Sequence, residues 1–270
     1  MTRVQTQRLF GTSWLVGLLL FAGVISWMLF DILQRDGVTG QREDVLVMGT
    51  NAGFKPFEYK QNNEIVGFDI DLAQEIAKAA GKTLKIEDMA FDGLLPALAS
   101  GQVDMVVAGM SVTPKRQQNA LFSDSYYSAA QRIIVRKGSP ITNKYQLDNQ
   151  KIGVQLGTTG DTFAAQHLKG AHVAKLPTAP SVLTELNAGG VDAVILDNAP
   201  AEQYIAGFPN LTILPGALSN EQYAIAIKKG NDALLQQVNQ TIADMKKDGR
   251  YDALIRNYFG AAADKTGANS

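Results

Sequence analysis

The sequence lacks cysteine, which excludes a disulfide framework, a thiolate metal site and a cysteine nucleophile. It has only two histidines, His167 and His172, which argues against a histidine-rich metal site. It also lacks an excess of charge of either sign, because 25 Lys and Arg residues face 26 Asp and Glu residues and leave a net charge of -1. Such a chain has no electrostatic footprint for a nucleic-acid backbone. We therefore expect no metal, no cofactor and no nucleic-acid partner.

The composition suits a folded domain. Of the 270 residues, 46% are hydrophobic and 19% are charged, which excludes a disordered chain and a coiled coil. At roughly 150 residues per domain, this length corresponds to about 1.8 domains, enough for one large core or two modest ones.

The N-terminal segment is strongly apolar, and no charged side chain occurs from Leu9 to Phe30. As a helix this run would be about 33 Å long, enough to cross about 30 Å of bilayer hydrocarbon. Two arginines precede it and Asp31 follows it, so the positive-inside rule keeps the N-terminus in the cytoplasm and exports the rest. We expect residues 1–35 to be a membrane anchor or signal segment, and the remaining chain to be periplasmic or otherwise extracytoplasmic.

The sequence leaves open whether this segment is cleaved. A secretory signal usually has a shorter apolar region, about 7 to 15 residues, that ends in an A-x-A-like site. The best candidate site, Val24-Ile25-Ser26, is followed directly by apolar residues 27–30, which is a poor context for a mature N-terminus. This favours an uncleaved anchor in the cytoplasmic membrane through residues 9–30, with cleavage as the alternative.

After this segment, short apolar runs alternate with stretches of helical periodicity, the pattern of an α/β protein with largely parallel sheets. The expected strands are 45–48, 83–86, 104–108, 131–135, 152–155, 193–196 and 223–227. The expected helices are 69–80, 94–100, 159–168, 181–187 and 234–247.

An internal repeat divides this pattern into two halves. Residues 94–107 and 182–195 each contain an expected helix, a glycine turn, the dipeptide Val-Asp and a buried strand. Asp104 and Asp192 occupy matching places in the two copies. The repetition predicts two similar α/β lobes.

Sequence motifs point to a family. Residues 67–77 read GFDIDLAQEIA and are preceded by PFEY at 56–59. Together these motifs resemble the extracytoplasmic solute-binding proteins that serve ABC importers of polar amino acids. The resemblance covers roughly residues 44–260 and continues through AGMSVTPKR at 108–116, FSDSYY at 122–127, GTT at 157–159 and ILD at 195–197.

The resemblance implies a two-lobed clamp, the type II periplasmic-binding-protein fold, in which each lobe is a mostly parallel sheet flanked by helices. Two crossover hinge strands would join the lobes, and turn-like segments at 136–140 and 228–230 suggest where the chain crosses. The expected division is 44–135 for lobe 1, 136–224 for lobe 2, 225–260 for the return to lobe 1 and 261–270 for a flexible tail.

A clamp around one free amino acid needs a cation for the carboxylate, an anion for the ammonium and walls that exclude water. Arg116 suits the carboxylate, because its planar guanidinium can bind both oxygens at once. It follows Pro114 in the first turn of a short helix that Thr113 is expected to cap. The alternative is an exposed arginine beside Lys115, and the resemblance implies the ligand-binding role.

Two further segments offer polar groups to the ligand. Thr158 and Thr159 begin an expected helix, where backbone N–H groups and hydroxyls favour an anion, although ordinary helix capping is the alternative and both roles are compatible. Asp197 ends a buried strand at its carboxyl edge, where open α/β sheets bind ligands. The resemblance implies that Asp197 receives the ligand ammonium, and capping of the next helix is the alternative.

The remaining candidate residues also come from the resemblance. Phe54 and Phe91 match the apolar walls around the ligand side chain, with an ordinary core role as the alternative. Gly109 and Ser111 match places where the family contacts the ligand beside the arginine. Asn51 stands where Asp is common, which removes a full charge from the contact with a basic side chain. The run GTNA at 49–52 nonetheless resembles arginine binders of the family and favours arginine.

The resemblance therefore implies a monomeric binding protein, not an enzyme. It would close over a free polar or basic amino acid, with arginine favoured, and deliver it to an ABC transporter permease in the membrane. Two other classes stay open. A dehydratase-like enzyme on the same fold could use Glu58, Asp161 and Asp197, although the exported part lacks the hydrolase, zincin, P-loop and dinucleotide motifs. A sensory ectodomain recognising an amino acid would suit an uncleaved anchor.

Overall fold

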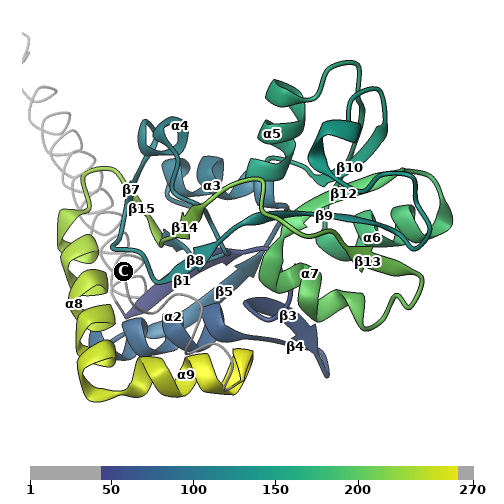
Figure 1. Ribbon diagram of the computed structural model, residues 1–270. Helices are drawn as coiled ribbons and strands as arrows, with labels where there is room; N and C mark the ends of the chain where they lie inside the picture. The colour runs from purple at the N-terminus through teal and green to yellow at the C-terminus, as the bar shows by residue number, and fades with distance from the viewer. Residues whose placement is uncertain (1–43, 261–270) are drawn as a thin grey trace, which may run out of the picture. The chain divides into compact units, whose positions relative to one another are not determined.

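A computed structural model describes residues 44–260 of the protein (Figure 1). The expected anchor or signal segment at 1–35 and the expected tail at 261–270 lie outside the described residues, so both stay predictions. Among residues 44–260, no helix combines the length and the apolar character needed to cross a bilayer.

The first lobe contains two sheets. Its strands are β1 (Val45–Thr50), β2 (Gly53–Phe54), β3 (Glu58–Gln61), β4 (Glu64–Val66), β5 (Thr83–Asp88), β6 (Met105–Val106), β7 (Ala120–Phe122) and β15 (Ala226–Lys228). The larger sheet has the order β5-β1-β6-β15-β7, and β2, β3 and β4 form a separate antiparallel sheet. In the larger sheet β1 runs parallel to β6, whereas β15 runs antiparallel to both β6 and β7.

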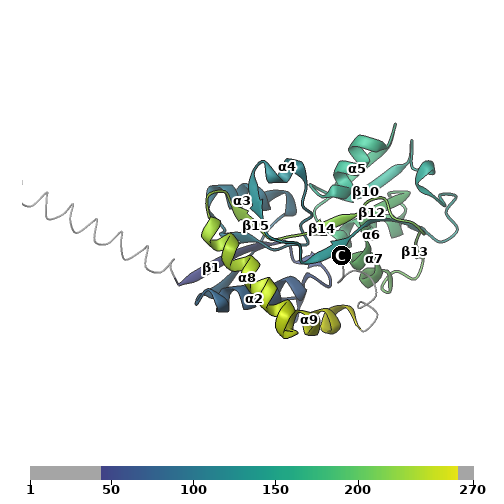
Figure 2. The ribbon, with the colours of Figure 1, turned by 60° about the vertical axis from the view of Figure 1, so that its left-hand side comes forward.

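The helices of the first lobe come from both ends of the described chain. They are α2 (Phe68–Ala79), η1 (Phe91–Gly93), α3 (Leu94–Ser100), α4 (Pro114–Gln117), α8 (Asp232–Asp248) and α9 (Arg250–Phe259). Figures 1 and 2 show α8 and α9, at the yellow end of the colour scale, packed beside α2. α2 buries the apolar face expected from its spacing, including Ile70, Ala73 and Ile76. The chain then turns at Gly81, whose φ of 66° is left-handed.

The second lobe has one mixed sheet. Its strands are β9 (Gln131–Arg136), β10 (Lys151–Gln155), β11 (His172–Leu176), β12 (Ala193–Asp197) and β13 (Leu211–Ile213). The order is β11-β10-β12-β9-β13, with β10 parallel to both neighbours and β9 antiparallel to both of its own. The helices of this lobe are η2 (Lys144–Gln146), α5 (Thr159–His167), α6 (Ala179–Ala188) and α7 (Asn198–Ile205). The expected two-lobed α/β clamp fold is confirmed.

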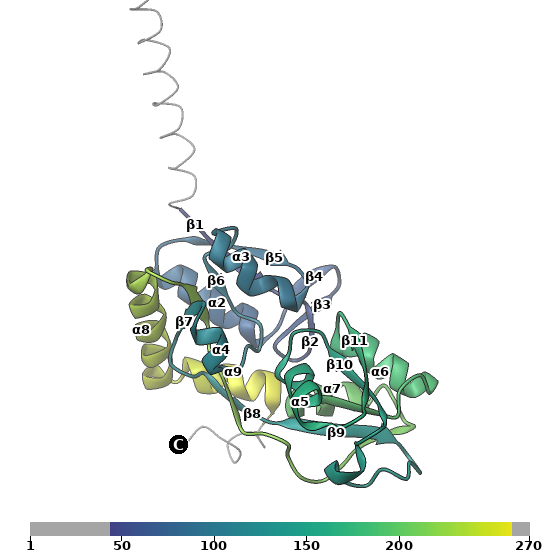
Figure 3. The ribbon, with the colours of Figure 1, turned by 90° about the horizontal axis from the view of Figure 1, so that it is seen from above.

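A two-stranded antiparallel ribbon joins the lobes. It consists of β8 (Tyr127–Ala129) and β14 (Glu221–Tyr223), with Tyr127 opposite Tyr223. Figure 3 shows β8 leading directly into β9, between the two lobes. Within residues 44–260, two short extended segments connect the lobes, as a hinge requires.

The crossing points differ from those suggested by the turn-like segments. Lobe 1 was expected to reach residue 135, but β9 pairs with β12 and β13 and so belongs to the second lobe. The chain therefore crosses at β8, before the turn at 136–140, which lies inside the second lobe and is tied to it by a hydrogen bond from Lys137 N–H to the Asn210 carbonyl. The turn at 228–230 follows β15 and leads to α8 within the first lobe, because the return crossing is made by β14.

All five expected helices correspond to helices of the structure, and six of the seven expected strands are present. The expected strand 223–227 is broken, because β14 belongs to the ribbon and β15 to the sheet of the first lobe. Between them Ala224 N–H donates to the Met110 carbonyl and Ile225 N–H donates to the Ser123 hydroxyl. One apolar run thus serves two sheets in succession, which its pattern does not reveal.

The internal repeat corresponds to a shared structural role. In both copies the helix ends on a left-handed glycine, after α3 and after α6. Asp104 then accepts a hydrogen bond from Val47 N–H at 2.8 Å, and Asp192 accepts one from Lys151 N–H at 2.9 Å. Each aspartate therefore fixes the neighbouring strand, β1 or β10, near its beginning.

Replacing Asp104 with alanine should lower the free energy of unfolding by about 1–3 kcal/mol, because Val47 N–H loses its acceptor in a partly buried place. Urea unfolding of the purified protein measures this change. Asp104→Asn retains an acceptor oxygen and should keep most of the stability. Equal losses in the two variants would contradict the role assigned to the hydrogen bond.

Candidate functional site

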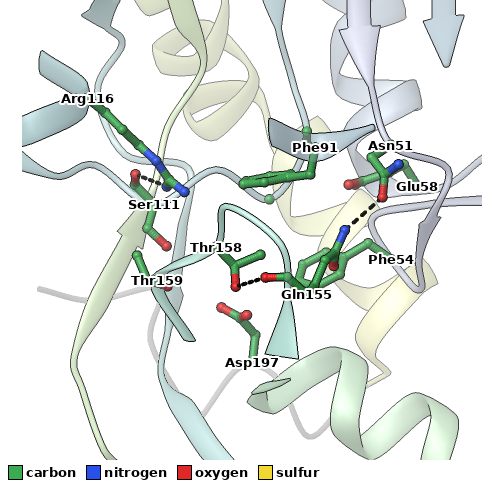
Figure 4. A pocket seen from close by; sticks show the side chains of 12 residues that line it. Asn51, Phe54, Glu58, Phe91, Ser111, Arg116, Gln155, Thr158, Thr159 and Asp197 are labelled. Carbon is green, nitrogen blue, oxygen red and sulfur yellow. Dashed lines mark hydrogen bonds between the residues drawn. The ribbon is translucent and has the colours of Figure 1, made fainter. Parts of the chain in front are cut away.

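One cavity between the lobes, with an empty volume of about 290 Å³, gathers the candidate residues (Figure 4). All nine residues predicted from the sequence line it, namely Asn51, Phe54, Phe91, Gly109, Ser111, Arg116, Thr158, Thr159 and Asp197. Three more residues complete the lining: Glu58, Ala108 and Gln155. The structure thus brings the predicted residues together, and their contacts with a ligand stay predictions.

Arg116 lies at one end of the cavity. The predicted cap is confirmed, because Thr113 accepts a hydrogen bond from Arg116 N–H at the start of α4. The guanidinium is half-buried: its Nη1 donates to the Ser111 carbonyl at 2.7 Å and its Nη2 donates to the Gly157 carbonyl of the second lobe at 3.1 Å. It also lies over the ring of Phe91, 5.3 Å from the centroid. Burial lowers the pKa of Arg116 from its usual value, an effect that Glu221 and Asp197 oppose, yet a guanidinium stays protonated at neutral pH.

The N-terminus of α5 faces this end of the cavity. Thr158 caps the helix as predicted, because its hydroxyl accepts from Asp161 N–H and also donates to the Gln155 carbonyl. The Thr159 hydroxyl accepts from the Gln131 side chain at 3.0 Å and donates to Glu221 at 2.8 Å. Both hydroxyls are therefore held by the protein, which fixes the helix terminus against the cavity.

Asp197 ends β12 at the carboxyl edge of the second sheet. It stands at the capping position of α7, but its side chain makes no capping hydrogen bond. Instead Asp197 Oδ1 accepts a hydrogen bond from the Tyr223 hydroxyl at 2.6 Å. This bond links the second lobe to the ribbon. Burial raises the pKa of Asp197 to about 7, Glu221 adds to the increase, and the hydrogen bonds from Tyr223 and Gln131 oppose it. A cation beside Asp197 would favour the ionised form of this acid and offset the cost of burying its charge.

Two phenylalanines form apolar walls. Phe54 is 6% exposed and Phe91 is 9% exposed, so both are core residues that also face the cavity. Gly109 lets Phe54 approach the backbone, because a Cβ at this position would lie 2.7 Å from the Phe54 ring. Its φ of 52° also favours glycine. Gly109 N–H is directed to Asp69 Oδ2 at 2.8 Å, below the cavity floor.

Glu58 lies at the end of the cavity opposite Arg116, on the same side as Asn51 (Figure 4). Its side chain is 1% exposed, and neither carboxylate oxygen accepts a hydrogen bond from a donor group, so the neighbouring acid Asp69 can bond to it only when one of the two acids is protonated. Burial raises the pKa of Glu58 well above its usual value, and Asp69 is the next largest cause. The adjacent amides are fixed, because Asn51 donates to the Met89 carbonyl at 2.7 Å and accepts from Gln155 at 2.9 Å.

Glu221 of the ribbon binds both lobes. Its Oε2 accepts hydrogen bonds from the hydroxyls of Ser111 in the first lobe and Thr159 in the second. Its Oε1 accepts from the Ser219 hydroxyl at 2.6 Å. Two of these donors line the cavity, so this one carboxylate connects the hinge with both walls of the site.

Sequence reasoning missed three of these polar residues as parts of the binding site. Glu58 lies inside the PFEY motif, but its burial depends on how the β2-β3-β4 sheet, to which it belongs, packs in the folded lobe. Gln155 ends β10 at the same sheet edge as Asp197, so the carboxyl-edge rule could have found it. No sequence motif pointed to Glu221, because its contacts with both lobes depend on its place in the ribbon of β8 and β14.

The structure places the acids considered for an enzyme in different surroundings. Glu58 and Asp197 line the cavity, whereas Asp161 does not and forms an ion pair with Lys175 at 2.9 Å. Within residues 44–260, no group of three or more His, Cys, Asp or Glu side chains is placed to hold a metal ion.

Comparison with known proteins identifies a family that this chain matches. The sequence model of the bacterial extracellular solute-binding proteins, family 3, matches residues 46–261. Arginine-binding extracellular protein ArtP of Bacillus subtilis (strain 168) is 34% identical over 254 residues, which cover 92% of this chain and 98% of that protein.

Solved structures are similar throughout the described chain. The arginine-, lysine-, histidine-binding protein ArtJ of Geobacillus stearothermophilus has a TM-score of 0.76 and 38% identity, covering 80% of this chain and 95% of its own. An ancestral arginine-binding protein bound to arginine has a TM-score of 0.76 and 42% identity over 80% of this chain and 99% of its own. An ancestral arginine-binding protein bound to glutamine has a TM-score of 0.74 and 42% identity, covering 80% of this chain and 98% of its own.

The buried acids predict a pH dependence of stability. Folding raises the pKa of Asp197 from 3.8 to about 7 and that of Asp69 from 3.8 to about 6, so the folded state binds these protons more tightly than the unfolded state. Their contribution is complete below about pH 4 and is lost progressively as the pH rises from there to about 6 for Asp69 and to about 7 for Asp197. The free energy of unfolding without ligand should therefore fall over this range. Asp197→Asn should flatten the fall, while Asp252→Asn, at an exposed position, should leave it unchanged; an unchanged slope in Asp197→Asn would contradict the assignment.

The contacts of Glu221 predict that it stabilises the closed site. Glu221→Ala removes the acceptor shared by Ser111 and Thr159, and hydrogen bonds to a charged group contribute about 1.5–3 kcal/mol. We expect the ligand to dissociate about ten-fold faster or more, as measured by displacement kinetics. Glu202→Ala removes the same charge from an exposed position on α7 and serves as the control. Equal dissociation rates in the two variants would disprove the role of Glu221.

Proposed function

The chain belongs to the bacterial extracellular solute-binding proteins of family 3, and from this premise we propose that its cavity holds one free amino acid with a cationic side chain, arginine above others, for delivery to an ABC importer. The amino acid would lie along the cavity, with its backbone groups toward Arg116 and Asp197 and its side chain toward Glu58 (Figure 4).

The Arg116 end suits the backbone of a free amino acid. A guanidinium from one lobe and the N-terminus of α5 from the other both favour a carboxylate. Asp197 offers an anion for the ammonium, and the phenylalanine walls exclude water, which strengthens both pairings. An amino acid derivative without either charge would leave one of these buried groups unpaired.

The preference for a cationic side chain rests on one observation: the buried carboxyl of Glu58 lines the cavity and has neither a donor group nor a cation beside it among residues 44–260. A buried carboxylate without a partner is costly, and a guanidinium or ammonium at this end of the cavity would remove that cost. Glu58 thus supplies the charge that Asn51 lacks. Relatives named for arginine, or for arginine, lysine and histidine, support the same preference.

Closure is supported by polar contacts that join the lobes. Gln155 of the second lobe donates to Asn51 of the first, and Arg116 donates to the Gly157 carbonyl. A third contact between the lobes is the hydrogen bond from Lys55 N–H of the first lobe to the Tyr204 hydroxyl of the second, at 3.1 Å. A ligand that touches both lobes would stabilise this arrangement over an open one, and a membrane permease could distinguish the two.

The proposal also covers where the protein is located and to which functional class it belongs. The family is extracellular, and we place this chain outside the cytoplasmic membrane with residues 9–30 as its anchor. It would act as a monomeric binding protein that engages a permease, rather than as an enzyme or a sensory ectodomain. The binding-protein names of its relatives support this class.

Calorimetric titration of the full-length protein in a mild detergent tests the proposal at about pH 8. Arginine should bind with a micromolar or lower dissociation constant, and citrulline, its uncharged isostere, at least ten-fold more weakly. Arg116→Ala should abolish binding of both ligands, because the carboxylate loses its cation, while Lys115→Ala at the exposed neighbour should not. Equal affinities for arginine and citrulline, or full binding by Arg116→Ala, would contradict the proposal.

A further inference from the structure

We propose that Glu58 and Asp69 form a proton-holding pair beneath the cavity and that a cationic ligand side chain replaces this proton, so that Asp69, which does not line the cavity, helps to set ligand specificity. This inference rests on the proposed function and adds a second residue and a proton to the same site. It is carried by the placement of two enclosed carboxyls, one of which faces the ligand.

The two carboxyls belong to the same lobe. Glu58 begins β3 and Asp69 lies in the first turn of α2, and both side chains are at most 1% exposed. Asp69 N–H donates to the carbonyl of Phe57, the residue before Glu58, at 2.9 Å, which brings the two residues together, and each carboxyl changes the pKa of the other. Because neither carboxyl comes from the second lobe, the pair does not depend on closure of the clamp.

The two carboxyls differ in the hydrogen bonds that they accept. Asp69 Oδ2 accepts from Gly109 N–H at 2.8 Å and from the Tyr126 hydroxyl at 2.9 Å. Glu58 accepts no hydrogen bond. Two donors stabilise the ionised form of Asp69, so the proton belongs on Glu58, whose pKa is raised well above its usual value by burial and by Asp69.

Acids and phenols lie around Glu58 in the part of the chain that the structure describes. The groups that act on it or respond to it are all acids or phenols: Asp69 from α2, Asp88 from β5, Asp197 from β12, Tyr126 from the segment before β8 and Tyr204 from α7. Asp88 is already paired with Lys60 at 2.7 Å. Among residues 44–260, no ion pair includes Glu58 or Asp69.

The aromatic packing behind the pair keeps it dry. Phe57 and Phe68 meet edge to face with centroids 6.2 Å apart, and Phe68 stacks on Tyr126 at 6.0 Å. All three side chains are buried. In such surroundings two ionised carboxyls repel strongly, whereas one proton or one external cation restores the balance.

The exchange conserves charge. Before binding, protonated Glu58 and ionised Asp69 together carry one negative charge. A guanidinium adds one positive charge as Glu58 releases one proton to solvent, so the occupied pair with its ligand again carries one negative charge. A neutral side chain leaves the proton in place, and Glu58 can then donate it to a ligand carbonyl oxygen.

The pair therefore makes specificity depend on pH. Below the pKa at which the pair loses its proton, the ratio of arginine to citrulline affinity should rise by about ten-fold per pH unit, because one proton is released per cation bound. Above that pKa the ratio should become constant. Asp197 also titrates near neutral pH, but it meets the ammonium that both ligands share, and its contribution cancels in the ratio.

Proton counting by calorimetry tests the exchange. Binding enthalpies of arginine and citrulline to the full-length protein are measured at about pH 6 in phosphate and in bis-Tris, two buffers with different ionisation enthalpies. Arginine should release about one proton more than citrulline. Equal proton counts for the two ligands would overturn the inference even if arginine binds tightly, whereas failure of arginine to bind at about pH 8 would refute the proposed function itself.

Three variants distinguish the role of Glu58 in the proton exchange from the role of Asp69. Glu58→Gln should abolish the difference in proton count and weaken arginine more than citrulline. Asp69→Asn keeps an acceptor for Gly109 and should keep arginine binding, but it should move the pH of half-maximal proton release downward. Tyr126→Phe removes one donor to Asp69 and should move this pH upward, which keeps the inference testable if Asp69→Asn does not fold. Unmoved pH profiles in both Asp69→Asn and Tyr126→Phe would show that Asp69 has no part in the exchange.

Discussion

Buried charge needs a partner, and the cavity between the lobes contains charges whose partners the described residues do not supply. Glu58 is enclosed with another acid, Asp69, as its neighbour and accepts no hydrogen bond from a donor group, and Asp197 is held by the Tyr223 hydroxyl but forms no ion pair within residues 44–260. At the other end Arg116 donates only to backbone carbonyls in the hydrogen bonds described. A small molecule with one negative and two positive groups would complete all three sites at once. Recognition of the ligand and closure around it then have the same physical origin.

The fold serves this arrangement by dividing the charges between two lobes. Glu58 and Arg116 belong to the first lobe and Asp197 to the second, so a ligand that pairs with all three contacts both lobes. The ribbon of β8 and β14 brings Glu221 between them, and its carboxylate binds hydroxyls from both walls. Gly157 allows the lobes to approach, since a Cβ there would lie 2.9 Å from Asp92 Cβ. The hinge, the contacts and the unmatched charges therefore act together.

Much of this could be predicted from the sequence. Apolar periodicity located all five expected helices, and the repeated Val-Asp dipeptide predicted two lobes whose aspartates have the same role. Motif resemblance selected nine residues that the structure brings around one cavity. The crossing points were wrong, because a turn inside one lobe and a hinge between lobes have the same composition. Glu58 and Glu221 were missed as site residues because their roles depend on tertiary burial and pairing, which no local pattern encodes.

The central claim is that a cation from the ligand completes the charge at Glu58 while Arg116 holds its carboxylate. A crystal structure of the protein with bound arginine tests this most directly. We expect guanidinium nitrogens within hydrogen-bond distance of the Glu58 carboxylate and the ligand carboxylate on Arg116, at opposite ends of the cavity. A bound arginine whose guanidinium points elsewhere, with Glu58 still lacking a partner, would contradict it.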